Sequence, residues 1–375
     1  MKFRKFGNLD QNVSALGFGA MRLPTTGHIK DIDEPAATEM VRHAIDGGVN
    51  YVDTAYVYHE GNSERFLGRT LQDGYREKVS LATKSPIWMV EKHEDFDRFL
   101  DEQLERLRTD RIDFYLLHCM QKRFWPKMQE LDVFRFAERA RADGRIGQFG
   151  FSFHDSLDVF REIVDAYDWS FCQIQYNYVG EDIQAGSKGL EYAADKGLGV
   201  IVMEPLYGGT LASPPAPVRP IWDDAPADTG PVDLALRWLW NQPAVTCVLS
   251  GMSTLEQVQQ NLASAERSGV GSLTADEHEL IARLQRKYDE LTPIPCTRCG
   301  YCMPCPSGVD IPVNLRLYND ATVFEGSAGL CRNLYRGLAD SQPAANCTTC
   351  GECEQRCPQQ IEISRLMGEI DKKFT

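Results

Sequence analysis

Between residues 35 and 267 the chain alternates between amphipathic segments of helical periodicity and short apolar runs. The segment AATEMVRHAIDGG leads into VNYVDTA, for example, and SERFLGRTLQDG leads into KVSLATK. With the early run SALGFGAMRLP there are eight apolar runs, each followed by a helix-like segment, the last being LEQVQQNLASAER. This alternation is typical of parallel βα units, and eight units predict a closed (β/α)8, or TIM, barrel of the α/β class. A doubly wound open sheet is the alternative.

Polar or reactive side chains recur where the predicted strands end. They are Asp53, Lys84, His118, Ser152, Gln173, Glu204 and Ser250. The C-terminal ends of the strands form the catalytic face of a βα barrel. Strand ends are commonly exposed and polar, so a single such residue indicates little, whereas seven in succession favour an active site.

The barrel pattern stops before the C-terminal part of the chain. One more amphipathic stretch follows Arg267, and TPIPC at 292–296 then interrupts the periodicity. Of the 12 cysteines, only Cys119, Cys172 and Cys247 precede this point, and the other nine follow it. We therefore expect a barrel domain over residues 1–290 and a Cys-rich domain over residues 291–375.

The overall charge and the N-terminal sequence limit the class of protein. The formal net charge is −14, which disfavours nucleic acid and anionic membranes as partners and leaves a small-molecule substrate or a redox protein. Neither a signal-peptide apolar run nor a stretch long enough to span a membrane is evident. We expect a cytoplasmic protein, in which clustered cysteines bind metal more commonly than they form disulfides.

Four strand-end and loop residues suggest proton transfer to a carbonyl group. Tyr58 lies five residues after Asp53, in the loop that follows a predicted strand. A tyrosine with its unperturbed pKa of about 10 is a poor proton donor at neutral pH unless a nearby cation stabilises the phenolate. Lys84 at the end of the next strand is placed to supply that charge, with Asp53 holding the ammonium. His118, one strand further on, is placed to hydrogen-bond a carbonyl oxygen.

Over about residues 5 to 265 the sequence resembles the aldo-keto reductases. The resemblance is carried by DTAYVY, LATK, YLLH, GRIGQFGFS, CQIQYN, MEPLYGG and SGMSTLEQVQQN. It implies that Tyr58 is the general acid, that Lys84 and Asp53 lower the pKa of Tyr58, and that His118 orients the carbonyl. It also implies a nicotinamide dinucleotide across the barrel mouth. The residues implied in binding it are Met21, Asp53, Ser152, Gln173, Pro205, Leu206, Ser250, Gly251, Met252, Ser253, Gln257 and Asn261.

Two segments depart from the pattern of the family. Many members have Ser-Asn after the fifth strand, where this chain has Ser152, Phe153 and His154, so one amide contact to the nicotinamide is missing or is replaced by His154. Tyr58 is followed by His59 and a glutamate, which lengthens the mouth loop and adds a titratable group. A loop histidine is more commonly solvated than catalytic.

The final βα unit bears on which dinucleotide is used. No Lys or Arg occurs between Arg237 and Arg267, where members that prefer the phosphorylated dinucleotide place cations. A 2′-phosphate without a nearby cation would be poorly compensated for leaving water, so we favour NAD(H) over NADP(H). Ser253 has two interpretations, because Glu256 three residues later also completes a helix capping box.

The C-terminal cysteines fall into two runs, CTRCGYCMPCP at 296–306 and CTTCGECEQRCP at 347–358. The second run resembles bacterial two-cluster ferredoxins, in which three closely spaced thiolates bind one [4Fe–4S] cluster and the fourth, before Pro, binds the other. This ferredoxin-like resemblance implies one cluster on Cys296, Cys299, Cys302 and Cys357. It implies the other on Cys347, Cys350, Cys353 and Cys305. Cys331 is left over, the last gap of the first run is one residue short, and structural zinc is the alternative.

Taken together, these patterns predict an oxidoreductase of the aldo-keto reductase type that acts on a carbonyl or alcohol group of a small molecule. Phe124, Trp125 and Trp222 are candidate walls of the substrate pocket. Two [4Fe–4S] clusters would exchange electrons with a redox protein. The pairing is a puzzle, because hydride transfer to a carbonyl needs no one-electron carrier. The alternative is therefore an electron-transfer or redox-sensing protein, with flavin as a candidate cofactor, whose barrel does not reduce carbonyls.

Overall fold

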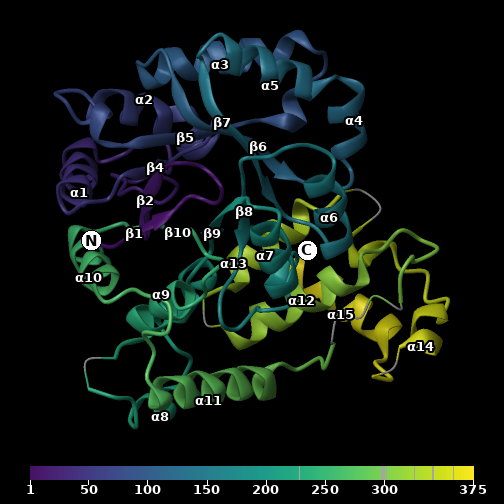
Figure 1. Cartoon of the computed structure of the whole chain (residues 1–375). Helices are drawn as coiled ribbons and strands as arrows, with labels where there is room; N and C mark the ends of the chain where they lie inside the picture. Colours follow the sequence, from purple (N-terminus) through teal and green to yellow (C-terminus); the bar gives the residue numbers. More distant parts are fainter. Residues whose placement is uncertain (228, 297–299, 301, 325, 340–341, 358) are drawn as a thin grey trace. The chain divides into compact units, whose positions relative to one another are not determined.

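The computed structural model describes residues 1–227, 229–296, 300, 302–324, 326–339, 342–357 and 359–375. Eight parallel strands close into a barrel in the order β10-β3-β4-β5-β6-β7-β8-β9 (Figure 1). They are β3 (Leu16–Gly19), β4 (Tyr51–Asp53), β5 (Ser80–Ser85), β6 (Ile112–Met120), β7 (Ile146–Phe153), β8 (Phe171–Gln175), β9 (Gly199–Met203) and β10 (Cys247–Ser250). The predicted barrel is confirmed, and the open sheet is wrong.

Amphipathic helices follow the strands and surround them (Figure 1). They are α1 (Glu34–Asp46), α2 (Asn62–Thr70), α3 (Glu94–Leu107), α4 (Trp125–Glu130), α5 (Val133–Ala142), α6 (Leu157–Asp165), α7 (Gly186–Asp195), α9 (Pro231–Trp240) and α10 (Leu255–Glu266). In α3 the buried Phe96, Phe99, Leu100, Gln103 and Leu107 recur at helical spacing, which turns one face toward the strands. The 3-10 turns between elements are η1 (Tyr58–Gly61), η2 (Arg76–Lys78), η3 (Ile87–Met89) and η4 (Tyr207–Ala212).

A small hairpin that the sequence patterns did not predict precedes the barrel. Strands β1 (Phe3–Lys5) and β2 (Asn12–Ser14) pair antiparallel. Phe6, between them, packs at the N-terminal end of the barrel in one cluster with Tyr51, Phe114 and Phe171. Gly199 allows this approach, because a Cβ there would lie 2.2 Å from the Phe6 ring. The Phe6 cluster fills the barrel interior at its N-terminal end. Side chains nearer the C-terminal ends of the strands are therefore available to form a site.

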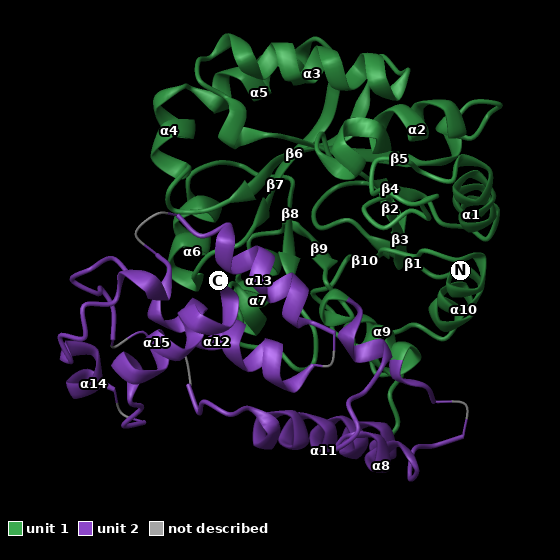
Figure 2. Cartoon of the chain, turned by 180° about the vertical axis from the view of Figure 1, so that it is seen from behind, with its two compact units in different colours: residues 1–208, 232–274 green, residues 209–231, 275–375 purple. Residues whose placement is uncertain are grey.

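The chain divides into two compact units, coloured separately in Figure 2. Unit 1 comprises residues 1–208 and 232–274, and unit 2 comprises residues 209–231 and 275–375. The helices of unit 2 are α8 (Arg219–Trp222), α11 (Ala275–Leu291), α12 (Ile311–Val323), α13 (Ala328–Arg336), α14 (Glu352–Arg356) and α15 (Ile363–Phe374), with a 3-10 turn η5 (Ala344–Asn346). The domain boundary expected near Leu291 stays a prediction.

Within unit 2, helices α12, α13 and α15 pack around one apolar core. This core includes Ile311, Leu315, Tyr335, Met367 and Ile370. Helix α12 begins at a capped end, where Asp310 accepts a hydrogen bond from the backbone N–H of Val313 (3.2 Å). Among the described residues, no helix is both long and apolar enough to cross a bilayer.

Candidate active site and candidate cluster site

Lys84 is the centre of the polar group at the barrel mouth. Its ammonium donates to Asp53 Oδ1 at 2.6 Å, to the carbonyl oxygen of Thr54 at 2.7 Å and to the hydroxyl of Tyr58 at 3.3 Å. The lysine side chain is only 1% exposed. Lys84 ends β5, Asp53 ends β4 and Tyr58 begins η1, so neighbouring parallel strands bring the three groups together. A fully buried charge is tolerated here because every ammonium proton has an acceptor.

The charges in this group act on one another. Burial raises the pKa of Tyr58, and the positive charge of Lys84 offsets part of that rise. Lys84 thus lowers the pKa of Tyr58, Asp53 raises it, and burial outweighs the lowering, so the role of the pair in proton transfer stays a prediction. Burial works against the charged form of Lys84, but Asp53 and Tyr58 raise its pKa overall. Burial also raises the pKa of Asp53, yet an ammonium 2.6 Å away holds it as a carboxylate.

His118 lies beside the phenol and is held neutral. The rings of His118 and Tyr58 meet edge to face at 5.9 Å between centroids. Burial lowers the pKa of His118 well below its ordinary value, and the charges of Lys84 and His154 lower it further. A neutral ring presents one N–H donor, which suits a carbonyl oxygen. Sequence reasoning missed Trp88 on η3, whose ring lies 5.2 Å from His118 and is 37% exposed.

Of the predicted aromatic walls, Trp125 belongs to the packing between two helices, and Phe124 and Trp222 stay predictions. Trp125 is 2% exposed and packs against Phe134 at 6.0 Å between centroids, so it belongs to the packing of α4 on α5. Trp222 lies on α8 in unit 2. The sequence shows which loops contain aromatic residues. It does not show that the loop after β5 brings Trp88 close to His118 on β6.

Two predicted carboxamide contacts lie on the interior face of adjacent strands. Ser152 on β7 pairs in register with Gln173 on β8. The Ser152 hydroxyl accepts from the backbone N–H of Cys119 at 2.8 Å. Gln173 directs its amide nitrogen to the sulfur of Met203 at 3.7 Å, a weak contact, and its Oε1 is buried without a partner in the described part of the chain. Asp53 Oδ2 and His118 Nδ1 are in the same condition. Buried polar atoms that lack a hydrogen-bond partner fit a site in which a bound polar ligand supplies the missing hydrogen bonds.

The residues predicted after β10 form a hydrogen-bonded group. Ser250 accepts from the Asn261 amide on α10 at 2.9 Å. The backbone N–H of Ser253 donates to Gln257 Oε1 at 2.8 Å, and its hydroxyl donates to the carbonyl oxygen of Arg22 at 2.8 Å. The N-cap of α10 is Thr254, whose hydroxyl accepts from the N–H of Gln257. The capping-box interpretation of Ser253 is therefore wrong, since the cap lies one residue later.

An arginine from the first barrel loop also lies at the end of β10. A Cβ added at Gly251 would lie 3.2 Å from the Cδ of Arg22. The sequence indicates a role for cations only near α10 and does not predict the position of Arg22. Parallel pairing of β3 with β10 brings Arg22 to the end of β10. The remaining predicted contacts differ in access. Met21 is exposed, Met252 and Pro205 are buried, and Leu206 is partly exposed.

His59 is buried, contrary to the expectation that this loop residue would be solvated. It is 4% exposed, and both ring nitrogens are hydrogen-bonded. Nε2 accepts from the backbone N–H of Leu23 at 3.3 Å, and Nδ1 lies 2.5 Å from the carbonyl oxygen of Ile29. A backbone N–H only donates and a carbonyl only accepts, so the proton is on Nδ1. Through these two hydrogen bonds, the His59 ring connects the segment after Tyr58 to the loop after β3.

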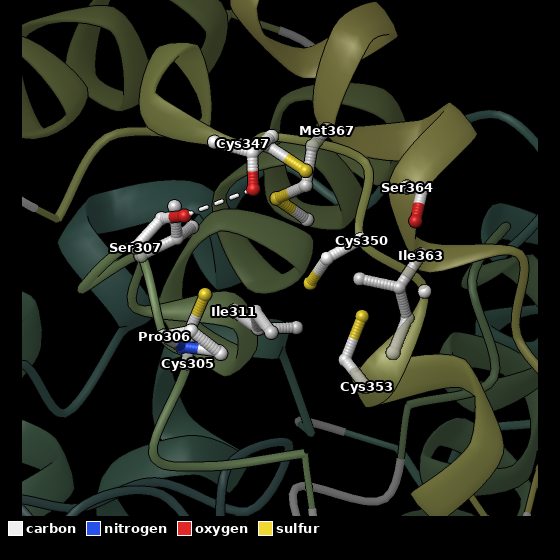
Figure 3. A pocket seen from close by; sticks show the side chains of 13 residues that line it. Cys305, Pro306, Ser307, Ile311, Cys347, Cys350, Cys353, Ile363, Ser364 and Met367 are labelled. Atoms are coloured by element: carbon white, nitrogen blue, oxygen red, sulfur yellow. Dashed lines mark hydrogen bonds between the residues drawn. The ribbon is translucent and has the colours of Figure 1, made fainter.

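In unit 2, one predicted set of cluster ligands lines a single pocket. Cys305, Cys347, Cys350 and Cys353 all border it, together with apolar side chains such as Ile311 and Met367 (Figure 3). The hydroxyls of Ser307 and Thr348 lie 3.1 Å apart and join the two cysteine runs (Figure 3). The N–H of Thr349 donates to the sulfur of Cys347 at 3.4 Å. Four thiols around one pocket fit a [4Fe–4S] cluster, whose sulfur environment also tunes its potential.

The other predicted set is only partly described. Cys296, Cys302 and Cys357 pack against the core of unit 2, whereas Cys299 and Pro358 lie outside the described residues. Cys331, predicted to bind no iron, is buried in that core. No three His, Cys, Asp or Glu side chains in the described ranges converge as they would around a single ion. In a cubane each thiolate binds a different iron, so its ligands are spread more widely.

Two family models match the chain. The Aldo/keto reductase family model matches residues 15–221, and a 4Fe-4S dicluster domain model matches residues 295–362. The second match covers both cysteine runs.

Curated relatives and solved structures agree with the first match. L-galactose dehydrogenase of Arabidopsis thaliana is 28% identical over 312 residues, which cover 75% of this chain and 94% of that protein. The uncharacterized oxidoreductase YqkF of Bacillus subtilis is 25% identical over 297 residues, covering 71% and 91%. The holo form of aldo-keto reductase AKR11C1 from Bacillus halodurans superimposes with a TM-score of 0.64 at 27% identity, covering 76% of this chain and 96% of that one.

Proposed function

Because the chain belongs to the aldo/keto reductase family and carries a 4Fe-4S dicluster domain, we propose that it is an NADH-dependent oxidoreductase acting on a carbonyl or alcohol group of a small molecule. Its clusters would exchange electrons with a redox protein. The observation that carries the catalytic half is the buried Lys84 ammonium, bonded at once to Asp53 and to the hydroxyl of Tyr58.

This arrangement suits proton transfer to a carbonyl oxygen. Tyr58 carries its proton at neutral pH, and although burial raises the pKa of the phenol, the positive charge of Lys84 offsets part of that rise and so favours donation of the proton. As the proton leaves, Lys84 at 3.3 Å stabilises the phenolate, and Asp53 keeps the ammonium in place. The neutral His118 orients the carbonyl oxygen toward the phenol. A bound nicotinamide supplies the hydride, and Ser152, Gln173, Ser250 and Ser253 are the residues that would hold it.

The preference for NADH rests on the absence of Lys and Arg from residues 238–266. Arg22 is the test of that preference, because its side chain lies against Gly251 at the end of β10. If NADPH is the better substrate by kcat/KM and Arg22→Gln removes that advantage, Arg22 holds the 2′-phosphate and the NADH assignment is wrong.

The cluster half of the proposal rests on the pocket lined by Cys305, Cys347, Cys350 and Cys353. A [4Fe–4S] cluster there would carry one electron at a time. A dinucleotide delivers two electrons together, so a flavin that separates them is a further candidate cofactor. Release of bound cofactor from the purified protein, followed by an assay for flavin, would show directly whether the protein contains one.

The proposed function is tested on protein purified without oxygen. We expect about eight iron atoms per chain and oxidation of NADH when small aldehydes or ketones are added. Wild-type and Tyr58→Phe proteins should bind NADH alike, and the variant should reduce the carbonyl about 100-fold more slowly or worse. Binding without any carbonyl reduction over a broad panel would favour the electron-transfer alternative.

A further inference from the structure

Gln175 is a buried amide for which the fold supplies no partner. It ends β8, two residues after Gln173 and four after Phe171. Phe171 belongs to the cluster that fills the barrel interior, and side chains alternate along a strand, so Gln173 and Gln175 also face the interior. Gln175 is 0% exposed, and neither its Nε2 nor its Oε1 has a hydrogen-bond partner among the described residues.

Such an amide is costly in the free protein. A buried polar atom that gives up water without gaining a partner destabilises the fold, and Gln175 has such atoms of both kinds, donor and acceptor. Gln103 shows what a structural glutamine requires. It is equally buried, but its Nε2 donates to Glu64 Oε1 and to the backbone carbonyl oxygen of Lys84. Its Oε1 accepts from the hydroxyl of Tyr115. The difference indicates that the missing partners of Gln175 come from a bound ligand, through a group that both donates and accepts hydrogen bonds.

The neighbouring strand lacks the amide that would otherwise bind such a group. Phe153 occupies the position after Ser152 on β7, and its ring packs at 5.0 Å from Phe160 of α6, away from the barrel interior. Gln173 beside it keeps one amide oxygen without a partner. The interior face at the end of β8 therefore carries two amides with unmet hydrogen-bonding capacity, next to the place where β7 offers none.

We propose that Gln175 binds the carboxamide of the nicotinamide and replaces the amide contact that Phe153 cannot make. The proposal rests on the proposed function, in which a nicotinamide dinucleotide occupies the barrel mouth. A primary carboxamide matches a glutamine amide, because each side has N–H donors and a carbonyl acceptor. Gln175 is thus a binding residue whose cost in the free protein is recovered when the dinucleotide binds.

The test compares Gln175→Leu with Gln103→Leu. Both changes replace a fully buried amide by the same slightly shorter apolar side chain, but only Gln103 loses hydrogen bonds. Without dinucleotide, we expect Gln175→Leu to raise the midpoint of thermal unfolding and Gln103→Leu to lower it. In calorimetric titrations, Gln175→Leu should bind NAD⁺ about tenfold more weakly than the wild type, as expected for the loss of about two hydrogen bonds.

An NAD⁺ analogue assigns the contact to the carboxamide. In 3-acetylpyridine adenine dinucleotide a methyl group replaces the amide nitrogen, so it cannot donate to Gln175 Oε1. The wild type should bind NAD⁺ more tightly than this analogue, and Gln175→Leu should bind the two nearly equally. A lower unfolding midpoint for Gln175→Leu would overturn the proposal, because the amide would then have a partner. An unchanged NAD⁺ affinity with a raised substrate KM would also overturn it, since Gln175 would then contact the substrate. If the wild type binds no dinucleotide at all, the proposed function fails first, which is a different result.

Discussion

The barrel site and the cluster site differ in what holds them together. In the barrel, the charges of Lys84 and Asp53 are buried and already paired at 2.6 Å, and their backbones belong to hydrogen-bonded strands. In unit 2, the cysteines that line the pocket come from two separate runs, and among the described residues the hydroxyls of Ser307 and Thr348 link these runs over a small core. The barrel site is therefore assembled by contacts already present in the fold, whereas we expect the cluster site to be held mainly by the iron it would bind.

The largest effect should come from a single ligand of the clusters. Cys357→Ala should lower the iron content from about eight atoms per chain to about four or fewer, because a crossed ligand set removes a ligand from the cluster on Cys296 to Cys302. Iron and sulfide analysis with electron paramagnetic resonance measures this. Cys331→Ala and Cys172→Ala should keep the full iron content. Loss confined to the cluster on residues 347–353 would refute the crossed assignment.

In the barrel, the largest effect should come from the buried ion pair. Lys84→Met leaves the Asp53 carboxylate buried without its cation and should lower the free energy of unfolding by about 3–5 kcal/mol. Denaturant unfolding of the iron-loaded protein measures it. Arg69→Met is the matched control, because the Arg69–Glu34 pair is about half exposed and should contribute about 0–1 kcal/mol. Equal losses in both variants would mean that burial of the pair is unimportant.

Removal of the phenol hydroxyl should affect turnover and leave the clusters intact. Tyr58→Phe should lower kcat for carbonyl reduction by about 100-fold or more, the scale of a lost general acid, with iron content unchanged. In the wild type, the pKa of His118 is lowered and that of Tyr58 is raised, so neutral His118 and protonated Tyr58 coexist between about pH 6.5 and 10. The kcat profile should be flat over that range. A decline centred near pH 6.5 would show that His118 titrates normally.

A smaller effect is expected from the histidine that fastens the loops together. His59 has a φ of 51°, which asparagine tolerates, so His59→Asn should keep the backbone but lose at least the bond to Leu23. We expect kcat to fall about fivefold, equivalent to about one hydrogen bond, with little change in KM. Hydrogen exchange at the Leu23 amide should become faster. His28→Asn, at an exposed neighbour in contact with Glu60, should change neither quantity.

Features visible in local periodicity were predictable, and contacts between distant segments were not. The run IDFYLLHCM coincides with β6, Ile112–Met120, because an apolar stretch, residues 114–117, forms its centre. The three-residue strands β1 and β2 are too short to show any period. The positions of Asp53, Lys84 and Tyr58 followed from strand ends and a family motif. The approach of Arg22 to Gly251, the burial of His59 and the contact of Trp88 with His118 each join separate loops, which no local pattern encodes.

The proposed function requires that the barrel take electrons from NADH and that the clusters carry them onward. Anaerobic mixing of the iron-loaded protein with one equivalent of NADH tests it, followed by optical spectra and electron paramagnetic resonance. NADH gives NAD⁺, a proton and two electrons that leave together, so with a bound flavin to separate them we predict one electron on each cluster and formation of one NAD⁺ per chain. Tyr58→Phe should behave alike, because cluster reduction needs no proton donor to a carbonyl. Clusters that stay oxidised while NADH is bound, or a failure of NADH to bind, would show that the barrel does not pass electrons from NADH to the clusters.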